Sequence, residues 1–107
     1  MLGTAYKVIV AKEAKQRFQN SLDYILSMYQ DIFVIRRLIE DYEKTLERLS
    51  KSADIYKLCR EPELAEEGYR VIHFEHYKYI MIYVINGDTV EVVSILHTLQ
   101  DVKKNVL

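Results

Sequence analysis

Four side chains that can exchange protons or bind phosphate lie within one strongly apolar part of the sequence: Arg70, His73, His76 and His97. Histidine changes charge near neutral pH and can act as a general acid or base, and a guanidinium binds phosphate through paired hydrogen bonds. Acid–base chemistry at a phosphate group needs such a base, such an acid and a cation in mutual reach. If the chain carries out such chemistry, its candidate catalytic residues are Arg70, His76 and His97.

The same histidines do not form a metal-binding pattern. His73 and His76 lie in a segment expected to be a strand, where residues three apart point to opposite faces of a sheet. Cys59 is the single cysteine, which excludes an intramolecular disulfide and a cysteine-rich zinc site. We therefore expect no metal site and no small-molecule cofactor.

The composition predicts one domain over residues 1–107. This length suffices for a single hydrophobic core. Fifteen basic against sixteen acidic residues give a formal charge of −1, so the chain as a whole does not attract nucleic acid. The apolar run Tyr6–Ala11 is too short for a signal-peptide core or a membrane span. A lone cysteine agrees with a reducing compartment, and we expect a cytoplasmic protein with no membrane partner.

Two helical patterns follow a short strand in the first half of the chain. Tyr6–Val10 is rich in β-branched residues and predicts the strand, and Lys12–Tyr29 has apolar residues every three or four positions. In the next segment a narrow apolar stripe predicts a second helix, which packs on the strand and the first helix; Asp31 before it is a plausible N-cap. One long helix is the alternative, but we favour a helical hairpin, which covers the stripe. The stripe consists of Ile32, Ile35, Ile39, Tyr42, Leu46 and Leu49.

The second half predicts an antiparallel sheet. Ser50–Gly68, with the only proline, is an irregular crossing with one helical turn near Ile55–Cys59. Asn86-Gly87 is a strong hairpin signal. The fold class is therefore α+β: an N-terminal strand, a helical hairpin and a three-stranded antiparallel sheet (β-α-α-β-β-β). The predicted strands of the sheet are Tyr69–Glu75, Lys78–Ile85 and Thr89–Leu96.

The hairpin register separates an aliphatic face from a tyrosine-rich one. The aliphatic face, with Ile80 and Ile82, has the density expected beneath two helices. The tyrosine face suits a partly wet surface that a partner covers, although tyrosines also commonly cap the rim of a core. We expect the tyrosine face and its edge, together with Arg70, to form the functional surface of the chain. The residues of this expected surface are Arg70, Tyr79, Tyr83, Ser94, His97, Gln100 and Asp101.

The order of these elements and their motifs resembles the RelE/ParE family of bacterial toxins from type II toxin–antitoxin modules, over almost the whole chain. The resemblance implies a small toxin that a cognate antitoxin encoded beside it holds inactive. Such toxins stop growth either by cutting mRNA on the ribosome or by poisoning DNA gyrase. The matching segments are Tyr6–Val10, Leu22–Ile25, Gly68–Arg70, Tyr79–Tyr83, Ile95–His97 and Gln100–Asp101.

The basic residues favour the ParE-like branch. RelE-type ribonucleases place Lys or Arg along the second strand, at the start of the third and after the fourth. This sequence keeps only Arg70 and has Ile72, Tyr79 and Gln100 where such enzymes are basic or catalytic. The stretch from Tyr69 to His97 holds two basic and three acidic residues, which suits ribosomal RNA poorly. We therefore expect a gyrase-directed or otherwise non-nucleolytic toxin.

Two alternatives stay open. Histidines serve catalysis in YoeB-like relatives, so a ribosome-dependent mRNA endoribonuclease that uses His76 and His97 is one. A degenerate member that only binds its antitoxin is the other. In each case we expect an antitoxin tail that orders on apolar surface and buries on the order of 2,000 Å².

Overall fold

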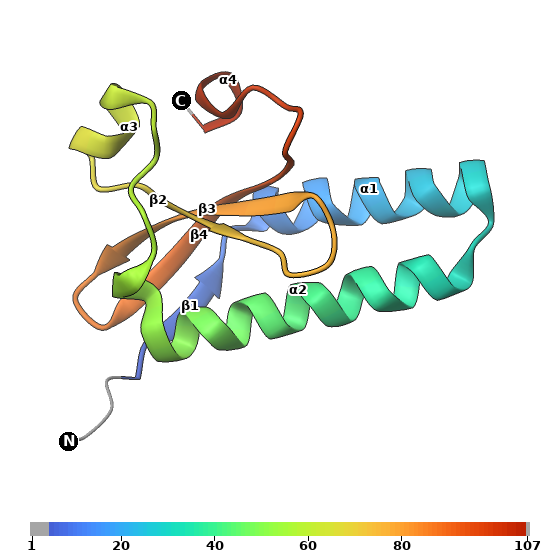
Figure 1. Cartoon of the computed structure of the whole chain (residues 1–107), viewed down its shortest axis with the longest axis horizontal. Helices are drawn as coiled ribbons and strands as arrows, with labels where there is room; N and C mark the ends of the chain where they lie inside the picture. Colours follow the sequence, from blue (N-terminus) through green and yellow to red (C-terminus); the bar gives the residue numbers. More distant parts are fainter. Residues whose placement is uncertain (1–4, 107) are drawn as a thin grey trace.

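The computed structural model describes residues 5–106, so residues 1–4 and 107 of the predicted domain lie outside the described part (Figure 1). No helix within residues 5–106 combines the length and apolarity of a membrane span. The sheet order is β1-β4-β3-β2, with β1 parallel to β4 and the other neighbours antiparallel. The predicted α+β fold is thus confirmed. The elements are β1 (Lys7–Val10), α1 (Lys12–Tyr29), α2 (Ile32–Ser52), the 3-10 turn η1 (Ala53–Ile55), α3 (Pro62–Glu66), β2 (Arg70–His73), β3 (Tyr79–Asn86), β4 (Thr89–His97) and α4 (Val102–Val106).

The two long helices form a hairpin, as predicted. Gln30 ends α1 in the left-handed conformation, at φ 52°, and its N–H donates to the Leu26 carbonyl over 2.9 Å. Asp31 caps α2, because its Oδ1 accepts from the N–H groups of Phe33 (3.0 Å) and Val34 (3.2 Å). Figure 1 shows that the hairpin end projects beyond the strands.

The second half contains more helix than the sequence predicted. The helical turn expected near Ile55–Cys59 lies earlier, at η1, and Pro62 begins the separate helix α3, where its missing N–H costs nothing. Helix α4 was not predicted. It follows an Asp101 cap, whose Oδ1 accepts from the Lys104 N–H over 3.0 Å, and it packs apolar residues on the sheet.

The turn between β3 and β4 lies one residue later than predicted. Asn86 still pairs with Thr89, so the two turn residues are Gly87 and Asp88, and it is Gly87 that adopts a positive φ of 65°. A β-bulge then shifts the register between Ile82 and Tyr83. An extra residue in one strand reverses the alternation beyond it, so residues 94–97 exchange faces relative to the prediction.

The long helices cover the tyrosine face, which was predicted to be open. The aliphatic face was expected beneath them, and this assignment was wrong. Phe18 and Leu22 of α1 and Leu38 of α2 join Met81 and Tyr83 in the main core. Tyr83 is fully buried because its hydroxyl donates to the Ala53 carbonyl over 2.6 Å, which satisfies its polar atom.

The opposite face is also covered. Ile80, Ile82 and Leu96 pack there with Leu64 of α3 and Cys59 in a second, smaller core, against which Val102 and Val106 of α4 also pack. Ser94 lies on this face and is 1% exposed. The expectation of an open sheet face was therefore wrong for Tyr83 and Ser94, since helices cover both sides.

The buried row of α2 differs from the predicted apolar stripe. Its buried residues are Leu38, Asp41, Thr45 and Leu49, whereas Ile39 is 36% exposed. The helix therefore points two polar residues toward the strands and leaves part of its aliphatic stripe in the groove beside α1. Asp41 and Thr45 are therefore polar residues in the interior of the protein.

Candidate functional site

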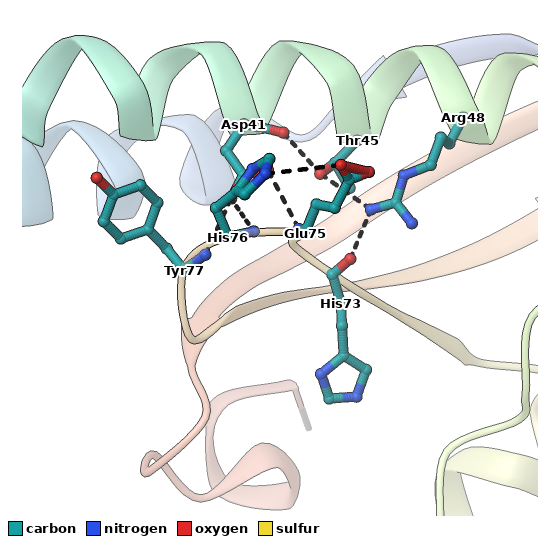
Figure 2. Close-up of polar contacts among 7 residues, drawn as sticks. All are labelled: Asp41, Thr45, Arg48, His73, Glu75, His76 and Tyr77. Atoms are coloured by element: carbon teal, nitrogen blue, oxygen red, sulfur yellow. Dashed lines mark hydrogen bonds and ion pairs between the residues drawn. The ribbon is translucent and has the colours of Figure 1, made fainter.

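A buried carboxylate fastens the β2–β3 loop to α2 (Figure 2). Asp41 is 2% exposed, and its Oδ1 accepts from the Glu75 N–H over 3.1 Å. Its Oδ2 accepts from the N–H groups of His76 (2.9 Å) and Tyr77 (3.1 Å). Three hydrogen bonds to an anion offset its removal from water. Asp41 thereby sets the path of the loop.

Two further residues of α2 complete this contact, which we call the α2 clasp (Asp41, Thr45 and Arg48 with residues 73–77). Thr45 Oγ1 donates to the Asp41 carbonyl over 2.7 Å. Arg48 Nη2 donates to the His73 carbonyl over 2.6 Å and to Thr45 Oγ1 over 3.4 Å. The His73 ring points away from α2 in Figure 2. The clasp therefore fixes the backbone of the loop at both of its ends.

His76, a candidate catalytic residue, lies on the outer side of the clasp. Its Nδ1 is 3.6 Å from Asp41 Oδ1 and its Nε2 is 3.8 Å from Glu75 Oε1. It lines an open cleft of about 370 Å³ that contains carboxylates as well as cations. The cleft is lined by Arg37, Glu40, Asp41, Lys44, His76 and Tyr77.

His97 lies elsewhere, at the end of β4, where the turn to α4 begins. Its ring Nδ1 accepts from the Leu99 N–H over 3.2 Å, and its backbone N–H donates to Gln100 Oε1 over 2.8 Å. Its ring meets that of half-buried Tyr79 edge to face, with centroids 5.3 Å apart. Gln100 and Asp101 thus shape this turn, and His97 does not line the cleft that holds His76.

Arg70, the predicted cation, holds the crossing to the sheet. Its Nη1 donates to the carbonyl oxygens of Tyr56 (2.5 Å) and Asp54 (3.3 Å). The half-buried Arg70 guanidinium is therefore hydrogen-bonded to backbone carbonyl groups in and next to η1. The structure does not bring Arg70, His76 and His97 into one cleft: each is tied to a separate segment.

A basic cleft that the sequence analysis missed lies outside the edge strand β2. This edge cleft, of about 410 Å³, places Arg48 and Lys57 beside Tyr56, with the Arg48 guanidinium 6.0 Å from the centre of the Tyr56 ring. None of its lining residues, all in the described part of the chain, is acidic. They are Arg48, Ile55, Tyr56, Lys57, Val71, Ile72 and His73.

Arg48 and Lys57 could not be predicted as part of this cleft from the last three strands. Arg48 belongs to α2 and Lys57 to the crossing, and both lie outside the stretch from Tyr69 to His97. Only the packing of α2 and the crossing along β2 brings them to the sheet edge. A count over the whole chain would have included them without locating them.

Comparison with solved structures supports the same fold. A chain from a structure titled "Chromosomal ParDE TA system from P. aeruginosa" superposes with a TM-score of 0.70. The match covers 88% of this chain and 97% of that one at 11% identity, so it defines the fold class alone. No protein with a curated description is significantly similar in sequence.

The family is defined by sequence. Residues 8–102 match the family model described as "ParE toxin of type II toxin-antitoxin system, parDE". The match spans most of the chain, from β1 to the start of α4. The chain therefore belongs to the ParE toxin family of type II toxin–antitoxin systems.

Proposed function

We propose that this chain inhibits growth by acting on DNA gyrase rather than by cutting mRNA. The observation that carries the proposal is the separation of the three candidate catalytic groups. Arg70 is engaged by the crossing, His76 lies against α2, and His97 is held in the turn before α4. Metal-free cleavage needs an acid, a base and a cation within hydrogen-bond reach, and this arrangement does not supply them together.

The proposal includes a cognate ParD-like antitoxin in the cytoplasm. The groove between α1 and α2, about 290 Å³ in volume, has an apolar floor that fits the apolar face of an antitoxin helix. One basic and one acidic residue line it, so electrostatics adds little to binding and the complex should survive high salt. The lining residues are Lys15, Phe18, Gln19, Leu22, Ile39, Tyr42 and Glu43.

Co-purification in rising salt tests this mode of neutralisation. The chain and the product of the neighbouring reading frame should stay together in about 1 M NaCl, where the Debye length is near 3 Å. Ile39→Lys places a charge in the groove and should weaken the complex, whereas Ile55→Lys, on exposed surface elsewhere, should not. Dissociation of the complex at moderate salt would show that ion pairs, rather than apolar contacts, hold the antitoxin on the toxin.

A ribosome-dependent mRNA endoribonuclease is the second candidate, and the edge cleft favours it. Arg48 and Lys57 offer two cations without an acidic neighbour among the lining residues, next to an aromatic ring on which a base could stack. His73 is the one residue among those lining the cleft that can exchange a proton near neutral pH, so the cleft does not supply both an acid and a base. We therefore rank this candidate second.

Induced expression separates the candidates. A gyrase poison should induce the SOS response without new mRNA ends, and Lys57→Ala should be as toxic as the wild type. A ribonuclease should give new mRNA ends without the SOS response and lose toxicity with Lys57→Ala. A chain that does neither, yet still binds its antitoxin, would be a degenerate member.

A further inference from the structure

The end of the helical hairpin exposes large apolar side chains that the fold leaves uncovered. Between Leu22 and Leu38 every residue is described by the structure and none is buried. We call the following five residues the hairpin tip. They are Tyr24 (61% exposed), Met28 (59%), Tyr29 (69%), Ile32 (53%) and Phe33 (70%).

The tip residues lie close together in space. A two-residue connection, Gln30 and Asp31, joins the helices, so Tyr29 and Ile32 flank the turn directly. Tyr24 and Met28 are one helical turn apart on the same side of α1. Five residues at 1.5 Å each keep Tyr24 within about 8 Å of the helix end along its axis. The five side chains therefore surround the end of the hairpin, within about two helical turns of the connection.

The tip carries almost no charge. Charged residues make up 29% of the chain, but in residues 24–35 (YILSMYQDIFVI) Asp31 is the single one. Its Oδ1 is engaged by the first N–H groups of α2. The nearest other charges are the exposed Asp23 on α1 and Arg36 and Arg37 on α2, which lie just outside this segment. Two tips would therefore meet over an apolar centre with charges only at its margin.

The position of the tip also suits a second copy. Figure 1 shows the connection between α1 and α2 at the end of the hairpin that points away from the strands, so no other described element lies in the way of an end-to-end approach. The groove between the helices is lined by Leu22 and Ile39 and lies closer to the sheet. A tip contact therefore does not require the groove.

We propose that two copies of this chain associate through their hairpin tips, with Tyr29 and Phe33 of each copy packing against the other copy's tip. Side chains of this size expose about 150–250 Å² when fully accessible, so the tip offers on the order of 600 Å². Two tips would bury at most roughly 1,200 Å², the lower limit for a specific interface, so the contact is expected to be weak. We expect a weak, reversible dimer, with a dissociation constant on the order of 10 µM.

Sedimentation equilibrium of the full-length chain from about 1 to 500 µM tests the proposal, since this range brackets the expected dissociation constant. The wild type should form a dimer that persists in high salt. Phe33→Lys and Tyr29→Lys should each raise the dissociation constant at least tenfold. Ile55→Lys, at a 69% exposed site away from the tip, is the matched control and should dimerise like the wild type.

Two outcomes overturn the proposal. One is a wild-type chain that stays monomeric over the whole range. The other is a dimer that Phe33→Lys and Tyr29→Lys leave unchanged, which would place the contact elsewhere. Far-ultraviolet circular dichroism of each variant shows that it is folded, as expected for exposed positions.

Discussion

The α2 clasp and the hairpin tip are opposite arrangements on the same helix. In the clasp, Asp41 and Thr45 are buried and hydrogen-bonded, while at the tip Ile32 and Phe33 are apolar and exposed. Helix α2 therefore buries polar groups where it meets the β2–β3 loop and exposes apolar groups where it leaves the sheet. The comparison teaches that shape and bonding partners, rather than side-chain polarity alone, decide what this helix buries.

Removal of the Asp41 carboxylate should have the largest effect on stability. Asp41→Ala leaves three loop N–H groups without their acceptor, and we expect a loss of about 3–5 kcal/mol in the free energy of unfolding. Thermal unfolding followed by circular dichroism measures it. Glu40→Ala, at the exposed neighbouring carboxylate, is the control and should change stability by less than about 0.5 kcal/mol. Equal melting temperatures for the two variants would show that the clasp is not needed for the fold.

The adjacent pair Leu38 and Ile39 tests which side of α2 faces the core. Leu38 is 1% exposed, so Leu38→Ala should cost about 2–5 kcal/mol through lost burial and a cavity. Ile39 is 36% exposed, so Ile39→Ala should cost about 1 kcal/mol or less. Urea unfolding of both variants gives the difference. A larger loss of stability for Ile39→Ala than for Leu38→Ala would show that the apolar stripe predicted from the sequence faces the core.

Arg70→Ala should lower both stability and toxicity. Loss of its hydrogen bonds to the Tyr56 and Asp54 carbonyls should cost about 1–3 kcal/mol. Toxicity should fall further than stability explains if the guanidinium also contacts the target. Growth inhibition at equal soluble protein is the measurement, with the exposed Arg60→Ala as control. An Arg70→Ala chain that inhibits growth like the wild type would remove Arg70 from the target surface.

The smallest effect concerns alkaline pH and the second core. Burial raises the pKa of the Cys59 thiol from 9.0 to about 11. Between these values the unfolded chain loses the thiol proton and the folded chain keeps it, so stability falls as pH rises through this range. Cys59→Ala should show a shallower loss of stability between pH 9 and 11. An identical pH profile in both proteins would mean that the thiol is accessible in the folded state.

The sequence predicted the order of the elements well because its signals there are local. Asp31 caps α2 and Gly87 accepts positive φ, and both properties belong to a single residue and its neighbours. The prediction of which residues share a face of the sheet was wrong for a physical reason. One bulge exchanges residues 94–97 between faces, and alternation of residue types cannot locate an extra residue.

The site was harder to predict because it depends on contacts between distant residues. Asp41 looks like one more charged helix residue, and its acceptor role arises only when the β2–β3 loop packs against it, 34 to 36 positions later. Tyr83 was expected on a wet surface, yet one main-chain carbonyl, that of Ala53, makes its burial possible. Arg48 and Lys57 became neighbours through the same long-range packing.

An assay of DNA supercoiling by purified gyrase tests the proposed target most directly. The full-length chain should inhibit supercoiling in proportion to its concentration, and prior addition of the cognate antitoxin should abolish the inhibition. Leu58→Lys, at an exposed apolar position outside the clefts described above, serves as a control for non-specific effects of apolar surface and should inhibit like the wild type. Undiminished supercoiling at a large excess of folded chain, together with mRNA cleavage on added ribosomes, would contradict the account and identify the chain as a ribonuclease.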